Sequence, residues 1–535
     1  NANGIAEQQS RRSSSYSNEN VLTYIKKIGQ HSLNVMVGSS LLYEENKTGS
    51  MTARDFISDV YGYNNLDAGA QWDKPNTGRS KSTLLSGFGR INYVLMDKYL
   101  FTVTGRADGS SKFGANNKWA FFPSFAAAWR INQEKFMKNI DWISNLKIRG
   151  SWGVTGNQNI PAYSSPEKMN TYTYPIGGVT SVGIGAGNMP NPDLKWETTA
   201  ITDIGIDLGV FNNRINFTAD YYYKKTTDLL WNISVPLTTG FGTVLKNIGS
   251  LQNKGLELSL SADVLTGPFK WNTMLNWSTN KNKVLEIPGY IPTQQGTISG
   301  HLKVNGSWLE PGLPVGVWNL LKTNGVMRTE KEWQDAARVA DSNFDKIGDM
   351  SFVDKNGDGK ISFGEDRQIV GDPNPDFIFG WTNNFSYKNF DLSVYINGSV
   401  GNDIYNVLRA ETNIVSAWGN QRAEVKDRWT VNNPNGKCPR AHVLVNQNLL
   451  QSDYLIEDGS FLRIQNVTLG YTFPKVSFLR SLRIYATAQN LLTITGYSGY
   501  NPEVNSQGQS NLQLGVDYNA YPTARSFILG VNIGF

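Results

Sequence analysis

Apolar and polar residues alternate with a period of two along much of this 535-residue chain. The last eleven residues show the pattern most clearly, with two alternating sets: Phe527, Leu529, Val531, Ile533 and Phe535 against Ser526, Ile528, Gly530, Asn532 and Gly534. Because alternate side chains of a strand point to opposite faces of a sheet, this stretch predicts a strand with one apolar and one polar face. An apolar sheet edge of this kind needs a pairing partner.

The same alternation predicts fifteen strands, most of them in pairs joined by short turns. They cover residues 21–27, 32–44, 84–96, 99–108, 118–131, 146–154, 198–210, 214–231, 253–264, 269–284, 376–387, 390–400, 461–473, 481–490 and 525–535. The links between pairs are long, all but one above 20 residues: 46–83, 109–117, 155–197, 232–252, 285–375, 401–460 and 491–524.

Strand length and link length together indicate a membrane protein. Strands of about ten residues, with apolar and polar faces and with alternating short and long connections, are typical of transmembrane barrels. Strands of soluble sheets are usually about 5–6 residues long, and the repeat of about 40–50 residues expected of a propeller is not seen. The predicted fold is therefore an all-β transmembrane antiparallel β-barrel, with long extracellular loops, short periplasmic turns and a periplasmic C-terminus.

Composition is consistent with this fold class and excludes others. Charged residues make up 18% and aromatic residues 12% of the chain, which also has 52 glycines; this composition favours all-β structure. No apolar run approaches the roughly 18 residues of a membrane helix. The net charge of +5 gives little support for nucleic-acid binding. Cys438 is the single cysteine and therefore cannot form an internal disulfide.

The number of strands and the start of the chain both predict a longer protein. Bacterial single-chain barrels have an even number of strands, whereas fifteen is odd. The chain begins Asn-Ala-Asn-Gly, without an initiator methionine or a basic-then-apolar signal segment. We therefore expect further strands upstream of residue 1.

Seven groups of residues, in order along the chain, resemble one known family. They are 106–113 (RADGSSKF), 146–157 (LKIRGSWGVTGN), 192–197 (PDLKWE), 220–225 (DYYYKK), 247–249 with 253–257 (NIG, NKGLE), 371–376 (GDPNPD), and 459–466 with 469–471 (GSFLRIQN, LGY). On these residues the chain is similar to the SusC/RagA group of TonB-dependent outer-membrane transporters of Bacteroidota. The resemblance implies a barrel of about 22 strands, of which residues 1–535 would supply the last fifteen, and an N-terminal plug domain that is absent from this chain.

The resemblance also implies partners and a function. We expect a SusD-like surface lipoprotein as a lid, coupling to TonB through the absent N-terminal region, contact with outer-membrane lipids, and a dimer of the two-protein unit. The substrate would be an oligosaccharide or, alternatively, a peptide, and the chain would not be an enzyme. Two other classes stay open: a passive porin or adhesion barrel, and a surface glycan hydrolase, which needs two carboxylates in one cleft.

The link 285–375, predicted to be extracellular, contains a motif with calcium-loop spacing at residues 354–365. Oxygen ligands at the spacing of a calcium loop suit Ca²⁺, and the candidate ligands are Asp354, Asn356, Asp358, Lys360 (through its carbonyl), Ser362 and Glu365. Thr329 and Glu332 predict a capping box, whereas residues 350–353 look extended, so no paired EF-hand is expected. A bound ion would order the loop; the alternative is a polar turn without metal.

Other candidate sites are weaker. Residues 183–187 (GIGAG) follow no buried strand and are interpreted as a flexible loop. The three histidines, His31, His301 and His442, are far apart in sequence and have no metal-binding spacing. Aromatic residues of the long links could stack on sugar rings or pack loop against loop: Tyr172, Tyr174, Trp318, Trp333, Trp418, Tyr497 and Tyr500.

Overall fold

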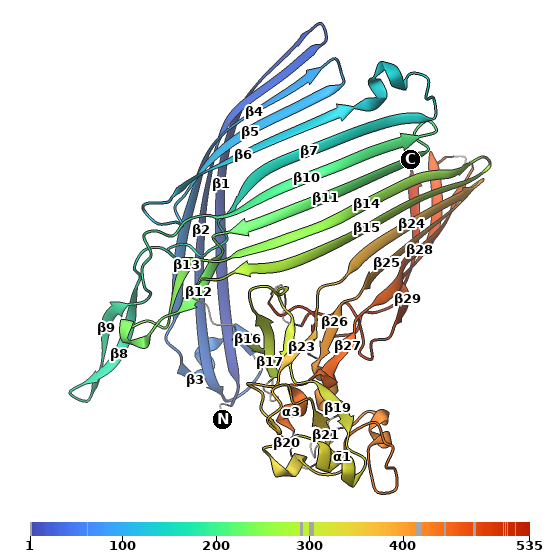
Figure 1. The fold of residues 1–535 in the computed structure, drawn as a ribbon. Helices are drawn as coiled ribbons and strands as arrows, with labels where there is room; N and C mark the ends of the chain where they lie inside the picture. The colour runs from blue at the N-terminus through green and yellow to red at the C-terminus, as the bar shows by residue number, and fades with distance from the viewer. Residues whose placement is uncertain are drawn as a thin grey trace. The chain divides into compact units, whose positions relative to one another are not determined.

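The computed structural model describes residues 3–60, 62–288, 293–298, 304–413, 420–442, 444, 446–474, 478–506, 508, 510, 512–518 and 520–535. His301 and Trp418 lie outside these residues. A large sheet contains fifteen strands that follow one another in chain order, with a short strand β3 (Gly69–Trp72) added beside β2. Figure 1 shows these strands as long arrows.

The fifteen strands correspond one to one with the fifteen predicted segments. Their bounds are β1 (Ile5–Ile28), β2 (His31–Phe56), β4 (Asn76–Leu95), β5 (Tyr99–Ser110), β6 (Trp119–Arg130), β7 (Ile143–Asn157), β10 (Glu197–Val210), β11 (Ile215–Thr227), β14 (Ser250–Thr266), β15 (Phe269–Glu286), β24 (Phe377–Tyr387), β25 (Phe390–Val400), β28 (Phe461–Phe473), β29 (Ser481–Thr495) and β31 (Ser526–Gly534). The all-β prediction is therefore confirmed in the number and order of its strands.

Short turns join the paired strands through backbone conformations that few residues adopt. Positive φ angles occur at Gly29 (56°), Asp97 (55°), Asn212 (58°) and Lys388 (52°), each within or beside a predicted turn. Tight hairpins need positive φ to match the twist of their strands. These turns fix the register of the pairs, such as Ile28 opposite His31 in β1 and β2.

The chain divides into two compact units. One contains residues 1–135, 148–204 and 224–250, and the other contains residues 136–147, 205–223 and 251–535. In the first unit, Leu22, Val37 and Ile91 are exposed by 78%, 59% and 47%. In the second, Phe527 and Leu529 of β31 are exposed by 74% and 85%. Each unit therefore presents an apolar face, as the alternation predicts.

The first strands are much longer than predicted. Strand β1 begins at Ile5 rather than at residue 21, β2 continues to Phe56, and β4 begins at Asn76. The predicted loop 46–83 is therefore wrong over half of its length, which belongs to β2 and β4. The missed residues are mostly Ser, Thr, Asn and charged, so they carry no apolar alternation. Backbone pairing, such as Arg12 opposite Lys47, extends these strands beyond the apolar band.

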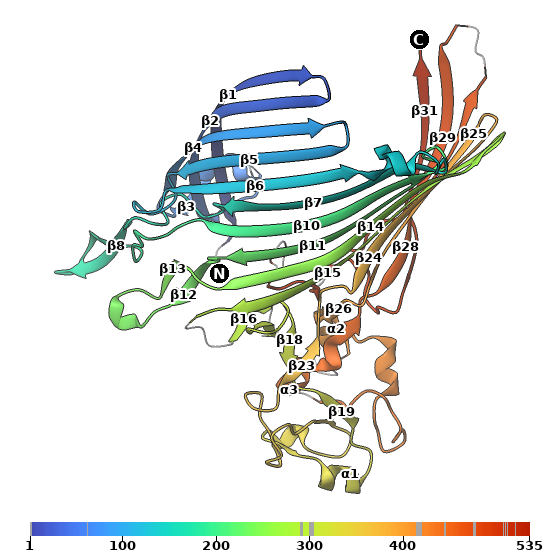
Figure 2. The same ribbon diagram turned by 45° about the horizontal axis from the view of Figure 1, so that its top comes forward.

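The link 155–197 contains a separate hairpin of β8 (Met169–Ile176) and β9 (Val179–Ala186), which projects away from the strands of its unit (Figure 2). The flexible loop predicted at 183–187 is therefore wrong, because most of it lies in β9. A side chain at Gly183 would meet the hydroxyl of Tyr174 at 1.4 Å, so glycine leaves room for that ring. The link 232–252 forms a second small hairpin, of β12 (Leu230–Ser234) and β13 (Thr243–Asn247).

Three long links of the second unit, 285–375, 401–460 and 491–524, fold together into one body that we call the loop module. It contains β16 (Thr293–Ile298), β17 (Val304–Leu309), β18 (Trp318–Leu320), β19 (Thr323–Val326), α1 (Glu330–Asp335), β20 (Arg338–Val339), β21 (Met350–Phe352), β22 (Lys360–Ile361), β23 (Gln368–Gly371), β26 (Asp403–Asn406), α2 (Val407–Thr412), α3 (Gln447–Leu450), β27 (Ile456–Asp458) and β30 (Val516–Asp517). The predicted capping box at Thr329 and Glu332 is confirmed, as is the extended segment at 350–352.

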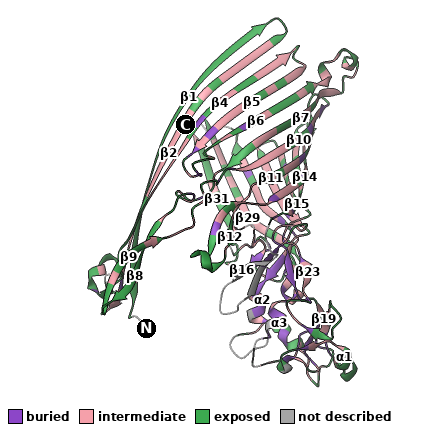
Figure 3. Cartoon of the chain, turned by 60° about the vertical axis from the view of Figure 1, so that its left-hand side comes forward, coloured by how far each residue is buried: buried purple, intermediate pink, exposed green. Residues whose placement is uncertain are grey.

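Most of the buried residues of the second unit lie in this loop module rather than between strands. Its apolar core includes Trp318, Leu320, Leu321, Phe352, Tyr405, Leu449, Leu450, Leu455 and Val516. Figure 3 shows buried residues concentrated around α2, α3 and β23. No helix among the described residues is long and apolar enough to cross a membrane.

Candidate functional site

Four of the family-like motifs converge on one apolar cluster in the first unit. Phe113 ends the first motif, Asn157 ends the second, and Leu194 and Trp196 belong to the third; Leu194 is fully buried and Trp196 is 5% exposed. The Phe113 and Trp196 ring centroids are 4.8 Å apart. Asn157 donates to the Glu197 carboxylate at 3.0 Å. From the fifth motif, the Asn247 side chain donates to the backbone carbonyl of Lys195 at 2.7 Å. These motifs therefore anchor long links to strand ends.

In the second unit, a row of polar positions crosses neighbouring strands. By register, Asn276 of β15 lies opposite Gly380 of β24, and Gly380 lies opposite Asn397 of β25. Asn397 in turn lies opposite Arg463 of β28, which lies opposite Thr493 of β29. Residues directly opposite on antiparallel strands share a face. This row therefore defines the polar face of the unit.

A cavity of about 880 Å³ lies against this polar face. Strands β11, β14, β15, β24, β25 and β28 form one side, and the loop module forms the other, through Pro373, Pro375, Asn402, Ile404 and residues 502–505 and 514–515. Its polar lining comes from Thr218, Asp220, Glu257, Ser259, Asn276, Ser278, Tyr395, Asn397, Ser399, Asn402, Glu503 and Asn505. Among the described residues, no Lys, Arg or His lines this cavity. The charged groups of this lining are therefore all carboxylates, and Glu503 among them is ion-paired with Arg463.

The cavity also offers hydrogen-bond acceptors to a ligand. The side-chain oxygens of Asn397 and Asn505 are buried and accept no hydrogen bond from the described residues. A buried acceptor without a donor is energetically unfavourable, so a donor from a ligand or water would satisfy each oxygen. The rings of Tyr395 and Phe461 supply apolar surface beside these acceptors.

Arg463 holds the loop side of the cavity to the sheet. Its side chain is 5% exposed, and its guanidinium donates to Asn501 at 2.7 Å and to Thr493 at 2.9 Å. It also forms an ion pair with Glu503. Because a buried charge is tolerated only when it is paired, Arg463 fixes the position of residues 501–503. The seventh motif, 459–466, thus contributes both Phe461 to the lining and Arg463 to its support.

The sixth motif positions the strand that follows it. Asp372 accepts hydrogen bonds from the backbone and side chain of Asn374 at 2.9 and 2.7 Å. The Asn374 side chain also donates to the carbonyl of Val315 and accepts from Asn282, at 2.9 and 2.8 Å. These contacts fasten the loop module to the start of β24, with Pro373 and Pro375 facing the cavity.

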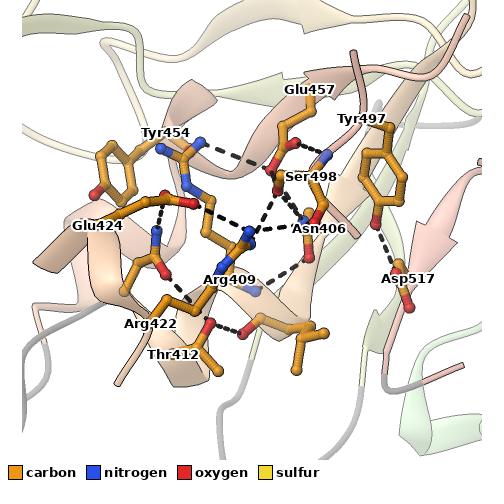
Figure 4. Close-up of polar contacts among 12 residues, drawn as sticks. Asn406, Arg409, Thr412, Arg422, Glu424, Tyr454, Glu457, Tyr497, Ser498 and Asp517 are labelled. Atoms are coloured by element: carbon orange, nitrogen blue, oxygen red, sulfur yellow. Dashed lines mark hydrogen bonds and ion pairs between the residues drawn. The ribbon is translucent and has the colours of Figure 1, made fainter. Parts of the chain in front are cut away.

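A polar network joins the second and third links of the loop module (Figure 4). Glu457 accepts from the Asn406 amide at 2.9 Å and from the backbone and hydroxyl of Ser498 at 2.9 and 2.8 Å. Arg422 donates to the Ser498 hydroxyl and carbonyl at 3.1 and 3.2 Å. The Arg409 guanidinium lies 4.6 Å from the Tyr454 ring. The network makes the link 491–524 depend on the link 401–460.

Burial changes the acidity of several groups in the loop module. Burial raises the pKa of Tyr497, whose hydroxyl donates to the Asp517 carboxylate at 2.6 Å. Burial also raises the pKa of Tyr405, whose hydroxyl donates to the carbonyl of Leu450 at 2.6 Å. For the Asp403 carboxyl, burial raises the pKa as well. The two phenols therefore remain protonated donors that hold the module together.

The predicted calcium loop is folded in a compact turn. Asp354 accepts from the backbone of Gly357 at 2.7 Å and of Gly359 at 2.8 Å. The Glu365 carboxylate accepts from Ser362 at 3.2 Å and from Asn356 at 3.4 Å. The loop thus brings hard oxygen donors of the right kind near one another. Among the described residues, however, no three His, Cys, Asp or Glu side chains gather closely enough to hold a metal.

The other predicted candidates have diverse surroundings. His31 and the hydroxyl of Tyr93 lie 2.6 Å apart, and His442 lies 2.6 Å from the Asp349 carboxylate. Trp318 is fully buried and Tyr497 is 5% exposed, so both pack within the loop module. Tyr172, Tyr174 and Tyr500 are exposed, and Trp333 stacks against Arg338 at 4.5 Å. None of these aromatic residues lines the cavity. Tyr395 and Phe461, which do, are in strands and were not singled out by sequence.

A long antiparallel sheet with an exposed apolar face, a polar face and a folded body of long links is the architecture of an outer-membrane barrel. Residues 2–357 match the family model described as TonB dependent receptor-like, beta-barrel. The chain belongs to this family, and the predicted fold class is confirmed.

Relatives support the same assignment. The chain is 36% identical to TonB-dependent receptor P3 of Formosa agariphila, over 99% of this chain and 53% of that protein. It is 33% identical to TonB-dependent receptor SusC of Bacteroides thetaiotaomicron, over 96% of this chain and 49% of that protein. The chain therefore spans about half the length of the curated relatives it matches.

The solved structure of the RagAB peptide transporter has a similar fold, with a TM-score of 0.84 and 24% identity, over 99% of this chain and 56% of that chain. The predicted resemblance to the SusC/RagA group is confirmed. Barrels of this family are outer-membrane proteins, so the chain is assigned to the outer membrane.

Proposed function

We propose that this chain is the barrel part of a transporter that imports a neutral oligosaccharide across the outer membrane. A SusD-like surface lipoprotein would close over the loop module, and TonB would act through a plug-containing region outside these residues. Two such pairs would form the dimer. The observation that carries the proposal is the cavity between the polar face and the loop module, with its acceptor-rich lining.

The chemistry of the lining suits a sugar. Oligosaccharides carry many hydroxyl donors, which can satisfy the free oxygens of Asn397 and Asn505. Their ring faces are partly apolar and can pack on the rings of Tyr395 and Phe461. The Glu257 carboxylate in this lining would disfavour sulfated or uronic-acid glycans.

A peptide is the second candidate. The Glu257 carboxylate would attract basic side chains or an amino terminus, because opposite charges in a partly desolvated cavity interact strongly. The RagAB peptide transporter is similar in fold. A peptide substrate would therefore be basic rather than acidic.

Binding to the full-length protein with its lipoprotein tests the proposal. Neutral oligosaccharides, sulfated oligosaccharides, and basic and acidic peptides would be titrated by calorimetry. Neutral oligosaccharides should bind, and their affinity should fall about tenfold in Asn397→Ala, because this change removes a hydrogen bond to the sugar. Asn466→Ala, on a neighbouring row of β28, is the matched control and should leave the affinity unchanged. Binding of sulfated glycans alone would contradict the proposal.

Two further measurements separate the remaining classes. Uptake that persists without TonB would indicate a passive porin. Product release from a bound glycan, lost in Glu257→Gln, would indicate a hydrolase, since the cavity contains more than one carboxylate. The transporter proposal expects TonB-dependent uptake and an unchanged glycan.

We also propose that the loop 354–365 binds Ca²⁺ and thereby orders the loop module. The Asp354, Asn356, Asp358 and Glu365 side chains would hold it, with the Lys360 carbonyl and Ser362 completing the set. Hard oxygen donors at this spacing support the proposal, and the hydrogen bonds between Glu365, Ser362 and Asn356 show that the two ends of the loop already approach each other.

A further inference from the structure

Three cations lie in one row across the first strands of the first unit. By register, Arg12 of β1 lies opposite Lys47 of β2, and Lys47 lies opposite Arg79 of β4. Like charges directly opposite one another destabilise a sheet. Folding alone therefore does not favour this row, which we call the basic row.

The surrounding carboxylates do not neutralise the basic row. Glu45 of β2 lies two residues from Lys47, on the same face, and opposite Lys81 of β4. The Glu45 carboxylate forms an ion pair with Arg79 and lies 3.9 Å from the Lys47 ammonium group. On this face, the even positions of 8–16 and the odd positions of 43–51 and 77–83 contain four cations and one carboxylate. The cations are Arg12, Lys47, Arg79 and Lys81, and the carboxylate is Glu45. The side chains of Lys47 and Arg79 are 53% and 57% exposed. The row thus carries an uncompensated positive charge open to solvent.

The basic row lies on the apolar face of its unit, just beyond the apolar band. Leu22 and Val37, opposite each other on that face, are exposed by 78% and 59%. Towards the basic row, the band ends with Tyr16 opposite Tyr43, a pair typical of a membrane interface. Arg12 is four residues beyond Tyr16, which is about 13 Å along a strand and about 9 Å along the normal at a tilt of about 45°.

The backbone of Arg12 therefore lies at the outer edge of the headgroup layer, which is about 5–8 Å thick on each side, and long Arg and Lys side chains can reach back into that layer. We propose that Arg12, Lys47 and Arg79 bind the phosphate of a phosphorylated glycolipid in the outer leaflet. Guanidinium groups recognise phosphate with paired hydrogen bonds, and bound phosphate would remove the repulsion within the row. The basic row lies at the ends of β2 and β4 that adjoin a long link, and the turn at Gly29 lies at the other end of the hairpin. Because long links of barrels are extracellular, this end of the strands lies in the outer leaflet. The inference depends on the outer-membrane location and not on the transported solute.

Full-length protein in nanodiscs tests the proposal. Nanodiscs would contain phosphatidylcholine with either monophosphoryl lipid A or its dephosphorylated form, and lipid retained after detergent exchange would be measured by native mass spectrometry. Wild-type protein should retain the phosphorylated form preferentially. Arg12→Gln, Lys47→Gln and Arg79→Gln together should reduce this retention by more than tenfold, because each cation near an anionic surface contributes about a fivefold effect.

Arg11→Gln is the matched control, because Arg11 lies opposite Thr48 and points to the other face. This variant should retain the phosphorylated lipid as well as wild type does at low salt. High salt should weaken retention by wild type. Heat-modifiability on gels would check that every variant is folded. Equal retention by the triple variant, or equal retention of both lipid forms, would overturn the proposal. Loss of lipoprotein binding by the triple variant, with lipid retention unchanged, would also overturn the proposal. Solute binding should remain normal in all variants. Failure of the lipid proposal can therefore be distinguished from failure of the transport proposal.

Discussion

The Arg440 guanidinium donates two hydrogen bonds to the carboxylate of Asp349, from Nε at 2.8 Å and from Nη2 at 3.1 Å, across 91 residues of sequence. The Asp349 side chain is 1% exposed, and His442 lies 2.6 Å from it. This relationship joins the first and second links of the loop module. Removing one partner of a buried pair leaves the other charge unpaired.

We therefore expect Arg440→Ala to destabilise the loop module by about 3–5 kcal/mol. Limited proteolysis of folded protein should then cut within 285–375 or 401–460 at lower protease concentration. The pair of Arg54 and Asp73, with side chains 39% and 47% exposed, is the control; Arg54→Ala should change stability by less than about 1 kcal/mol. Equal resistance of the Arg440 variant and wild type would contradict the expectation.

The motif cluster of the first unit gives a second prediction. Trp196→Ala should reduce the free energy of unfolding by about 3–5 kcal/mol, because it removes a buried ring from Phe113 and Phe122. Denaturant titration in detergent measures this change. Tyr63→Ala removes a ring that is 64% exposed and should have little effect.

Arg463 gives a third prediction, which concerns the cavity. Arg463→Ala should weaken solute binding by at least about tenfold, since residues 501–503 lose their attachment to the sheet. Arg480→Ala, which removes an exposed cation near the same strands, should retain normal binding. Normal affinity in the Arg463 variant would show that the cavity does not contact the solute.

The turn after β6 predicts a pH effect. Hydrogen bonds from Lys98 (2.7 Å), Tyr99 (2.8 Å) and Trp129 (3.1 Å) lower the pKa of Glu134 from 4.5 to about 2. Because the folded-state pKa is depressed, the stabilisation is complete above about pH 4.5 and is lost as pH falls towards 2. Wild type should therefore melt at a higher temperature than Glu134→Gln at pH 7, and the difference should disappear near pH 2. A difference that is independent of pH would contradict this account.

Metal removal tests the calcium loop. Chelator-stripped protein should show heat on titration with Ca²⁺ and should gain protease resistance in the loop module. Asp354→Ala with Asp358→Ala should abolish both effects, since two carboxylate ligands are lost. Lys360→Ala is the control, because that position would contribute its backbone carbonyl. Absence of heat in wild type would retire the metal proposal.

Periodicity predicted the strands well where their residues are apolar on one face. It placed all fifteen strands and most of their turns, because alternation and turn residues are local properties. It failed at the open end of the hairpin β1–β2, where Ser, Thr and charged residues are held only by pairing with the neighbouring strand. It also failed at 183–187, where glycines accommodate the tyrosine rings of a partner strand.

The candidate cavity was much less predictable. In the sequence, Phe461 and Arg463 stand out only as parts of a family-like motif, and Asn397 and Asn505 do not stand out at all. These residues have no distinguishing local pattern, because an inward-facing Asn or Arg in a strand looks like any other polar position.

The sequence by itself determined the strand alternation, the two faces and the family, since each depends on residues close together along the chain. Only the tertiary structure decided which polar residues form a site. Asn397, Arg463 and Glu503 belong to two strands and a long link, and the register of the sheet brings them together. The same register places Arg12, Lys47 and Arg79 in one row, because hydrogen bonding between strands, and not sequence separation, sets which side chains are neighbours.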